Sequence, residues 1–166
     1  KTWLMYVFCP AWTTYHSMTA ITRPVVMINQ GKGTYLLQLR ALNVAQINVG
    51  KLGLLEVLPG YYAYLGSAFG PGGLNARIRR HLRRDKKLRW HIDYLRKFTL
   101  DTCAYYEETS RKECLFANEL VEAGGRILQK GFGSSDCSCD SHLVYFEKQL
   151  PIKKYVVEHN LVRFQG

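Results

Sequence analysis

Residues 60–97 constrain the fold of this chain most strongly, because tyrosines, glycines and arginines follow one another there in separate blocks. Residues 61–65 hold three tyrosines and a leucine, and bulky side chains of this kind favour a half-buried strand. Residues 70–73 are glycine and proline, which cannot continue a strand or sit well inside a helix. Because residues 74–84 then return to helical periodicity, the segment predicts a strand, a turn and a basic helix in that order.

The expected helix carries two kinds of arginine. At 100° per residue, Leu74, Ile78 and Leu82 form one apolar stripe. His81 falls inside this stripe, and Arg77 lies along its edge, near the end of the tyrosine strand. We therefore expect Arg77 to face the body of the protein, while the outer arginines are free to meet solvent or phosphates.

The basic segment makes nucleic acid the expected partner. Residues 77–97 hold ten lysines or arginines against two aspartates, a net +8 within a chain of formal charge +10. Such a run repels itself unless a polyanion neutralises it, although a solvated face is the ordinary alternative. The aromatic content of 13% supplies rings on which bases stack, which favours nucleic acid over an acidic membrane surface. DNA is expected as the partner more than RNA. The candidate phosphate contacts are Arg79, Arg80, Arg83, Arg84, Lys86 and Lys87.

Length and composition predict one domain of ordinary size. The 166 residues suffice for a real core, and no segment approaches the ~20 apolar residues that cross a bilayer. The five cysteines are an odd number without a C-x-x-C pair, which favours reduced thiols in a cytoplasmic protein. Residues 1–26 fit the rest poorly and are expected to be an extension of uncertain origin, or else an extra strand, with the domain at 27–166.

The remaining elements follow from periodicity and from glycine punctuation. The helix expected at 88–98 has His91 in its apolar stripe and Asp93 on the opposite side, near Arg89 and Lys97. Strands are expected at 34–40, 46–49, 52–58, 99–109 and 142–147, with the pair at 46–58 forming an inserted hairpin. The pattern at 148–166 predicts no specific element.

A further helix is expected at 110–123, with a capping box at its start. Ser110 and Glu113 have the spacing at which each side chain satisfies a free backbone N–H of the first turn. Glu113 also projects on the same arc as the apolar residues of this helix, so it is directed towards the body of the domain and could serve a metal. Glu119 is the competing carboxylate.

Cys137, Cys139 and His142 bring three metal-ligating side chains into six residues, and Cys114 could supply a fourth. This composition suits zinc, although the spacing is not that of a common zinc finger. The alternative is a polar loop with buried thiols that leads into the strand at 142–147.

Three motifs together resemble the GIY-YIG nuclease superfamily. In that family a strand ends in Gly-Ile-Tyr, a neighbouring strand carries Tyr-Ile-Gly, and the next helix bears an arginine with a histidine one turn on. The corresponding residues here are Gly-Thr-Tyr at 33–35, Tyr-Leu-Gly at 64–66, and Arg77 with His81. The two tyrosine motifs are farther apart than is usual in the family, a difference that the inserted hairpin absorbs.

A more specific resemblance covers residues 31–146. The segments GSAFGPGGLNARIRRHLRR, WHIDYL and GFGSSDCSCDSHL look like a branch known as domain of unknown function family 123. That branch brings no established activity with it.

The superfamily resemblance implies an α+β fold, with a small central antiparallel or mixed sheet flanked by helices. It also implies phosphodiester hydrolysis with Mg²⁺ or Mn²⁺. Tyr35 would orient or deprotonate the attacking water, and Tyr64 would help to place the phosphate. Arg77 would stabilise charge on the phosphoryl oxygens, and His81, one turn on, belongs to the same catalytic set. A helix glutamate, here Glu113, would hold the divalent cation.

Two other classes of function stay open at this point. The first is a nucleic-acid-binding module without turnover, which uses the basic helix but not Tyr35 or the glutamate. The second is a zinc-stabilised interaction domain in which the four cysteine and histidine ligands matter and the tyrosines belong to the core.

Overall fold

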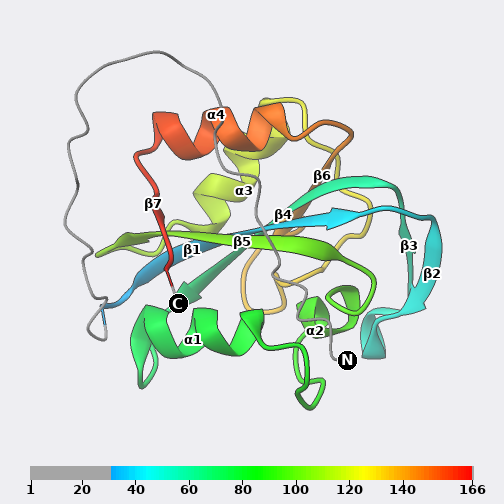
Figure 1. Ribbon diagram of the computed structural model, residues 1–166, viewed down its shortest axis with the longest axis horizontal. Helices are drawn as coiled ribbons and strands as arrows, with labels where there is room; N and C mark the ends of the chain where they lie inside the picture. The colour runs from blue at the N-terminus through cyan, green and yellow to red at the C-terminus, as the bar shows by residue number, and fades with distance from the viewer. Residues whose placement is uncertain (1–30, 166) are drawn as a thin grey trace, which may run out of the picture.

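The structure is a computed structural model that describes residues 31–165 (Figure 1). The expected extension at 1–26 and the expected start of the domain at Met27 lie outside the described residues.

The described part of the chain contains seven strands, four α-helices and one 3-10 turn. In chain order they are β1 (Gly33–Ala41), β2 (Ala45–Asn48), η1 (Gly50–Leu52), β3 (Leu54–Val57), β4 (Gly60–Ala68), α1 (Gly73–Leu82), α2 (His91–Leu95), β5 (Leu100–Glu108), α3 (Glu113–Glu122), β6 (Leu143–Phe146), α4 (Leu150–Glu158) and β7 (Val162–Arg163). No helix within residues 31–165 combines the length and the apolar character that crossing a bilayer requires.

Five strands form one antiparallel sheet in the order β6-β4-β1-β5-β7, and β2 pairs with β3 in a separate hairpin. This arrangement confirms the expected α+β class. Helices α1 and α2 lie on one face of the sheet, while α3 and α4 lie on the other (Figure 1). Because both faces are covered, seven consecutive residues of the central strand β1, 33–39, are buried.

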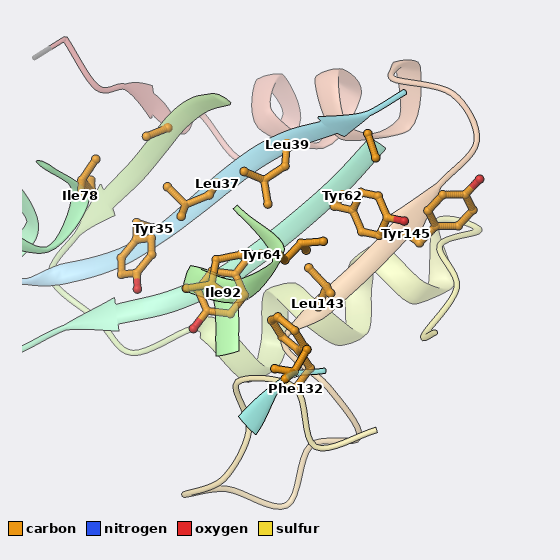
Figure 2. Close-up of a cluster of buried hydrophobic side chains, with 14 of the residues drawn as sticks. Tyr35, Leu37, Leu39, Tyr62, Tyr64, Ile78, Ile92, Phe132, Leu143 and Tyr145 are labelled. Carbon is orange, nitrogen blue, oxygen red and sulfur yellow. The ribbon is translucent and has the colours of Figure 1, made fainter. Parts of the chain in front are cut away.

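Alternation along the strands divides the core into two layers. Leu37 and Leu39 face α1 and α2, where they meet Ile78, Ile92 and Phe132 (Figure 2). Each of these five side chains is almost fully buried, and burying an aliphatic side chain contributes about 1.5–3 kcal/mol relative to exposing it. The layer therefore holds α1 and α2 firmly against the sheet.

The opposite layer joins the sheet to the two later helices. Leu36 and Leu65 alternate with the residues of the first layer and pack with Phe116, Leu120 and Ile152 of α3 and α4. This layer fixes where α3 begins, and its first turn is part of the site described below.

Two glycines allow the chain to turn directly from β4 into α1. Gly72 and Gly73 have φ angles of 80° and 53°, a left-handed conformation that other residues adopt only with strain. The backbone N–H of Leu74 donates to the carbonyl of Gly31 at 2.8 Å, which fixes the start of the helix against the beginning of β1.

The second helix is shorter than its apolar periodicity predicts, and Asp93 is the reason. Its carboxylate is buried and accepts hydrogen bonds from the backbone N–H groups of Arg89 and Trp90 at 3.0 and 3.1 Å. These bonds hold the residues before His91 in a turn rather than a helix. The expected position of Asp93 opposite the buried stripe was therefore wrong, because its side chain points inward, whereas its expected neighbour Arg89 does contact it through the backbone N–H.

Helix α3 begins three residues later than predicted, and the expected capping box does not form. The Ser110 hydroxyl donates to the Glu107 carboxylate at 2.9 Å, and Lys112 is the N-cap residue, without a side-chain cap. Thr34 takes over the anchoring of this segment. Its hydroxyl donates to the Ser110 carbonyl and accepts from the Lys112 backbone N–H, both at 2.8 Å.

Candidate active site

One pocket of about 470 Å³ opens where β1, β4, α1 and the start of α3 meet the loop at 131–142. Its walls include most of the residues that the sequence singled out for catalysis. The predicted catalytic residues that line it are Tyr35, Tyr64, Arg77 and Glu113. Trp90 and His142 also line it. Four side chains that are distant in the sequence thus converge on one open cavity.

Tyr35 and Tyr64 lie on neighbouring antiparallel strands, as predicted. Tyr35 of β1 stands opposite Gly66 of β4, and Tyr64 stands opposite Leu37, so both rings project from the same face of the sheet (Figure 2). Their centroids are 6.5 Å apart. The two tyrosines therefore line one wall of the pocket.

Gly66 provides the space that the Tyr35 ring occupies. A Cβ atom at position 66 would lie 2.3 Å from the Tyr35 hydroxyl oxygen and 2.5 Å from Cζ. No side chain larger than hydrogen fits there while Tyr35 keeps its position.

Tyr35 is hydrogen-bonded to His81, which lies behind it in α1. The hydroxyl oxygen and His81 Nε2 are 2.9 Å apart, and His81 is 1% exposed. Nδ1 of the same ring is buried and has no hydrogen-bond partner among the described residues. His81 is therefore placed to exchange a proton with Tyr35 alone.

Burial keeps both groups of this pair neutral. Desolvation raises the pKa of Tyr35 well above its usual value, and the pKa of Tyr64 is raised for the same reason. Desolvation, with the nearby Lys86 ammonium, lowers the pKa of His81 to about 3. At neutral pH the pair consists of a phenol and an uncharged imidazole.

Arg77 is held at the pocket by an aromatic side chain instead of a carboxylate. Its guanidinium lies 4.4 Å from the ring centroid of Trp90, and that of Arg80 lies 3.8 Å from the same ring. Within residues 31–165 no ion pair is found for Arg77. Its positive charge is therefore available to an anion in the pocket.

Glu113 is the carboxylate that reaches the pocket. Its Oε2 atom is buried without a hydrogen-bond partner among the described residues. Glu119, by contrast, accepts a hydrogen bond from the Tyr155 hydroxyl at 2.5 Å and lies 3.2 Å from His159 Nε2. Since an unpaired buried carboxylate oxygen is costly, Glu113 is the better candidate for holding a cation.

Four of the six basic residues proposed for phosphate contacts bond to other groups of the protein. Arg80 and Lys86 each form a 2.9 Å ion pair with the buried Asp93, so their charges also organise the turn before α2. Arg84 donates to the Thr99 carbonyl at 3.2 Å and Arg79 to Asn75 Oδ1 at 2.7 Å. The expectation that Arg80 points freely outward was wrong, because Asp93 holds it.

A second, basic depression of about 510 Å³ lies next to these residues. It is lined by Arg80, Arg83, Lys86, Lys87, Leu88 and Arg89. Arg83 and Lys87 are exposed. Arg89 lines both this depression and the 470 Å³ pocket. The depression and the pocket are therefore adjacent.

The cysteine and histidine residues form a cluster beside the pocket, as predicted. The ligand atoms of Cys114, Cys137, Cys139 and His142 all lie within 4.8 Å of one another. His142 Nε2 is 3.5 Å from the sulfur of Cys114 and 3.4 Å from that of Cys137. Such a cluster could hold a metal ion, and its three sulfurs favour Zn²⁺ over Mg²⁺ or Mn²⁺.

Trp90 and Arg111 are pocket residues that the sequence did not single out. Trp90 falls in the turn that was expected to be helical, and only the fold brings it against Arg77. Arg111 lies 4.7 Å from the ring centroid of Phe69, and both side chains line the pocket. A tryptophan next to an arginine run was the one signal that could have suggested a cation-binding ring.

Comparison with known families gives one match. The family described as domain of unknown function DUF123 matches residues 34–162, which is most of the chain. No curated protein and no solved structure matches the chain.

Proposed function

We propose that this chain, which belongs to the family described as domain of unknown function DUF123, hydrolyses phosphodiester bonds in nucleic acid. The observation that carries the proposal is the convergence of Tyr35, Tyr64, Arg77 and Glu113 on one pocket. DNA is the proposed substrate, and a divalent cation such as Mg²⁺ or Mn²⁺ is the proposed cofactor.

The charges around the pocket suit a phosphodiester. Arg77, Arg89 and Arg111 line it together with the carboxylates of Glu113 and Asp136. Guanidinium groups stabilise the negative charge that grows on the phosphoryl oxygens in the transition state. Carboxylates are the protein ligands that Mg²⁺ prefers. The pocket therefore offers ligands for both an anion and a hard cation.

Tyr35 and His81 can move one proton away from an attacking water. As the water attacks, Tyr35 would accept its proton while passing its own hydroxyl proton to His81 Nε2 across the 2.9 Å hydrogen bond. A pKa of about 3 disfavours the resulting imidazolium in the free protein. A bound phosphodiester adds negative charge nearby, which raises the pKa of His81 and makes the transfer less costly.

Glu113 would hold the divalent cation. Its orphaned buried Oε2 atom fits such a ligand, since a cation would satisfy the oxygen that nothing in the described chain pairs. When bound, the cation supplies Lewis acidity that assists departure of the leaving oxygen. Thr34 positions this residue, because its hydroxyl fixes Ser110 and Lys112 immediately before the first turn of α3.

The experiment is a cleavage assay over single-stranded, duplex, flapped and branched DNA with Mg²⁺ or Mn²⁺, run beside a binding titration. Arg77→Ala should lower the cleavage rate by about 10²–10³-fold and leave binding within a few-fold, since it removes a charge used mainly in the transition state. Tyr35→Phe should abolish cleavage, because it removes the hydroxyl group that accepts the proton of the attacking water. Tyr105→Phe, on the opposite face of the sheet, and Arg126→Ala, outside the pocket, are the matched controls.

A nucleic-acid-binding module without turnover is the second candidate. The basic depression lined by Arg83 and Lys87 favours it, since this surface needs neither Tyr35 nor Glu113 to bind phosphates. If the parent protein binds the DNA panel well but cuts none of it, this candidate replaces the hydrolase.

A further inference from the structure

We infer that Cys114, Cys137, Cys139 and His142 bind one structural zinc ion that joins the start of α3 to the loop at 131–142. The four ligand atoms come from two segments that are distant in the sequence and lie within 4.8 Å of one another. Two sulfur-to-nitrogen distances in the cluster are 3.4 and 3.5 Å. Tetrahedral zinc with Zn–S near 2.3 Å and Zn–N near 2.0 Å places a sulfur and a nitrogen ligand about 3.5 Å apart, which these two pairs already match.

The composition of the cluster indicates a structural site. Three thiolates and one imidazole are a complete tetrahedral set, which leaves no open position for water or substrate. The three cysteine thiols are free, so no disulfide accounts for their proximity. Hydrophobic packing does not account for it either, because Cys137 is exposed.

Zinc would fasten the middle of this loop, whose two ends are already held by the rest of the fold. Residues 131–142 contain turns and bends but no helix or strand. Its two ends are tied, by the Gly131 N–H to the Asp140 carbonyl at 2.7 Å and by the His142 N–H to the Phe132 carbonyl at 2.8 Å. Cys137 and Cys139 lie between these ties, in the part of the loop that a metal would fasten to Cys114.

The zinc would also shape the candidate active site, and this step rests on the proposed function. Glu113 precedes Cys114, and Asp136 precedes Cys137, so each pocket carboxylate is adjacent in the chain to a zinc ligand. His142 contributes to both the cluster and the pocket lining. The sulfur ligands favour zinc, and the two neighbouring carboxylates favour Mg²⁺ or Mn²⁺. Zinc would therefore stabilise the wall of the pocket, and the second cation would bind inside the pocket.

The test is the zinc content of the purified full chain, measured by mass spectrometry of the metal after dialysis against zinc-free buffer. The parent should hold one zinc per chain, and Cys139→Ala and His142→Ala should lose it. His142→Cys and Cys139→His keep four ligands and should retain zinc, which covers the outcome that the alanine variants fail to fold. Asp136→Asn, in the same loop but outside the ligand set, is the matched control and should retain zinc.

Cobalt substitution reads the ligand set directly. The Co²⁺-loaded parent should show thiolate charge-transfer bands and the intense visible bands of tetrahedral cobalt, and His142→Cys should strengthen the charge-transfer absorption. A parent that holds no zinc after refolding with zinc overturns the inference, as does zinc retained in full by Cys139→Ala and His142→Ala. If the protein holds zinc but cuts no DNA, the zinc site stands and the proposed hydrolase is refuted. If a zinc-free parent cuts DNA, the zinc site is refuted and the proposed hydrolase stands.

Discussion

Replacing Gly66 by alanine tests the geometry of the tyrosine pair most directly. The φ angle of Gly66 is outside the left-handed region, so its backbone accepts alanine, and the three atoms nearest to the new methyl group all belong to the Tyr35 side chain. Restoring ordinary contact from 2.3 Å to at least 3.4 Å requires the Tyr35 hydroxyl to move by 1.1 Å, the difference between the two distances. That movement breaks the 2.9 Å hydrogen bond to His81.

The expected effect has a stability part and a rate part. Inserting one methyl group into a packed core costs about 1–3 kcal/mol, and losing the hydrogen bond adds about 1 kcal/mol. Misplacing a catalytic group by about 1 Å can lower a rate by roughly 10²-fold. Gly66→Ala should therefore destabilise the protein and reduce cleavage far more than it reduces DNA binding.

Urea unfolding measures the first part, and the cleavage assay measures the second. Gly70→Ala is the matched control, because Gly70 also lines the pocket but an added Cβ there meets nothing within 4 Å. Tyr35→Phe in the Gly66→Ala background removes the closest atom and should recover part of the lost stability. The reasoning is refuted if Gly66→Ala unfolds and cleaves like the parent, or if Gly70→Ala is equally damaging.

Further predictions concern charge. Asp93→Asn should lower the free energy of unfolding by about 3–5 kcal/mol, because it leaves two partly buried cations without their counterion; a loss near zero in urea unfolding would contradict this. Burial opposes ionisation of Asp93, but hydrogen bonds from these cations outweigh it and hold its pKa below the usual 3.8. Its stabilising contribution is therefore full above pH 3.8 and is lost as the pH falls through the lower folded value, which acid titration of parent and variant would reveal. Log affinity for duplex DNA should fall with log salt at a slope near −4 for a footprint of about four or five phosphates, and a slope near zero would remove DNA as the partner. Arg83→Ala with Lys87→Ala should reduce that slope by about 2. Glu113→Gln should raise the Mg²⁺ concentration needed for half-maximal cleavage, and Glu119→Gln should leave it unchanged.

Local pattern predicted most of the elements but not all of their ends. The strand at 61–66 and the helix at 74–84 were confirmed within a few residues, because tyrosines, glycines and an apolar stripe act over short distances. Helix α4 was missed, although Pro151 in its first turn and the buried pair Ile152 and Tyr155 were available signals. Strand β7 has only two residues and exists because it pairs with β5, so no local pattern could specify it.

Side-chain partners at the ends of elements were the least predictable feature. Ser110 and Glu113 have a capping-box spacing, yet Ser110 bonds to Glu107, and Thr34 anchors the segment from the distant β1. Asp93 has a polar side chain on a helical pattern, yet it is buried because Arg80 and Lys86 approach it from another part of the chain. In both cases a residue of another element, Thr34 of β1 or Arg80 of α1, contributes a bond that the local pattern does not specify.

The sequence by itself determined the chemistry that the chain has available: a tyrosine strand, a basic helix, a helix glutamate and a compact set of cysteine and histidine ligands. Only the tertiary structure decided which of these groups meet. The antiparallel register of β1 and β4 places Gly66 beneath the Tyr35 ring, and the packing of α1 on that face brings His81 within 2.9 Å of its hydroxyl. The Thr34 anchor then brings Glu113 to the same pocket, and the loop at 131–142 returns Cys137 and His142 to Cys114. These contacts join residues from 23 positions apart, for Cys114 and Cys137, to 78 positions apart, for Thr34 and Lys112. Their formation depends on burying both faces of the sheet, a property of the whole fold that no single segment encodes.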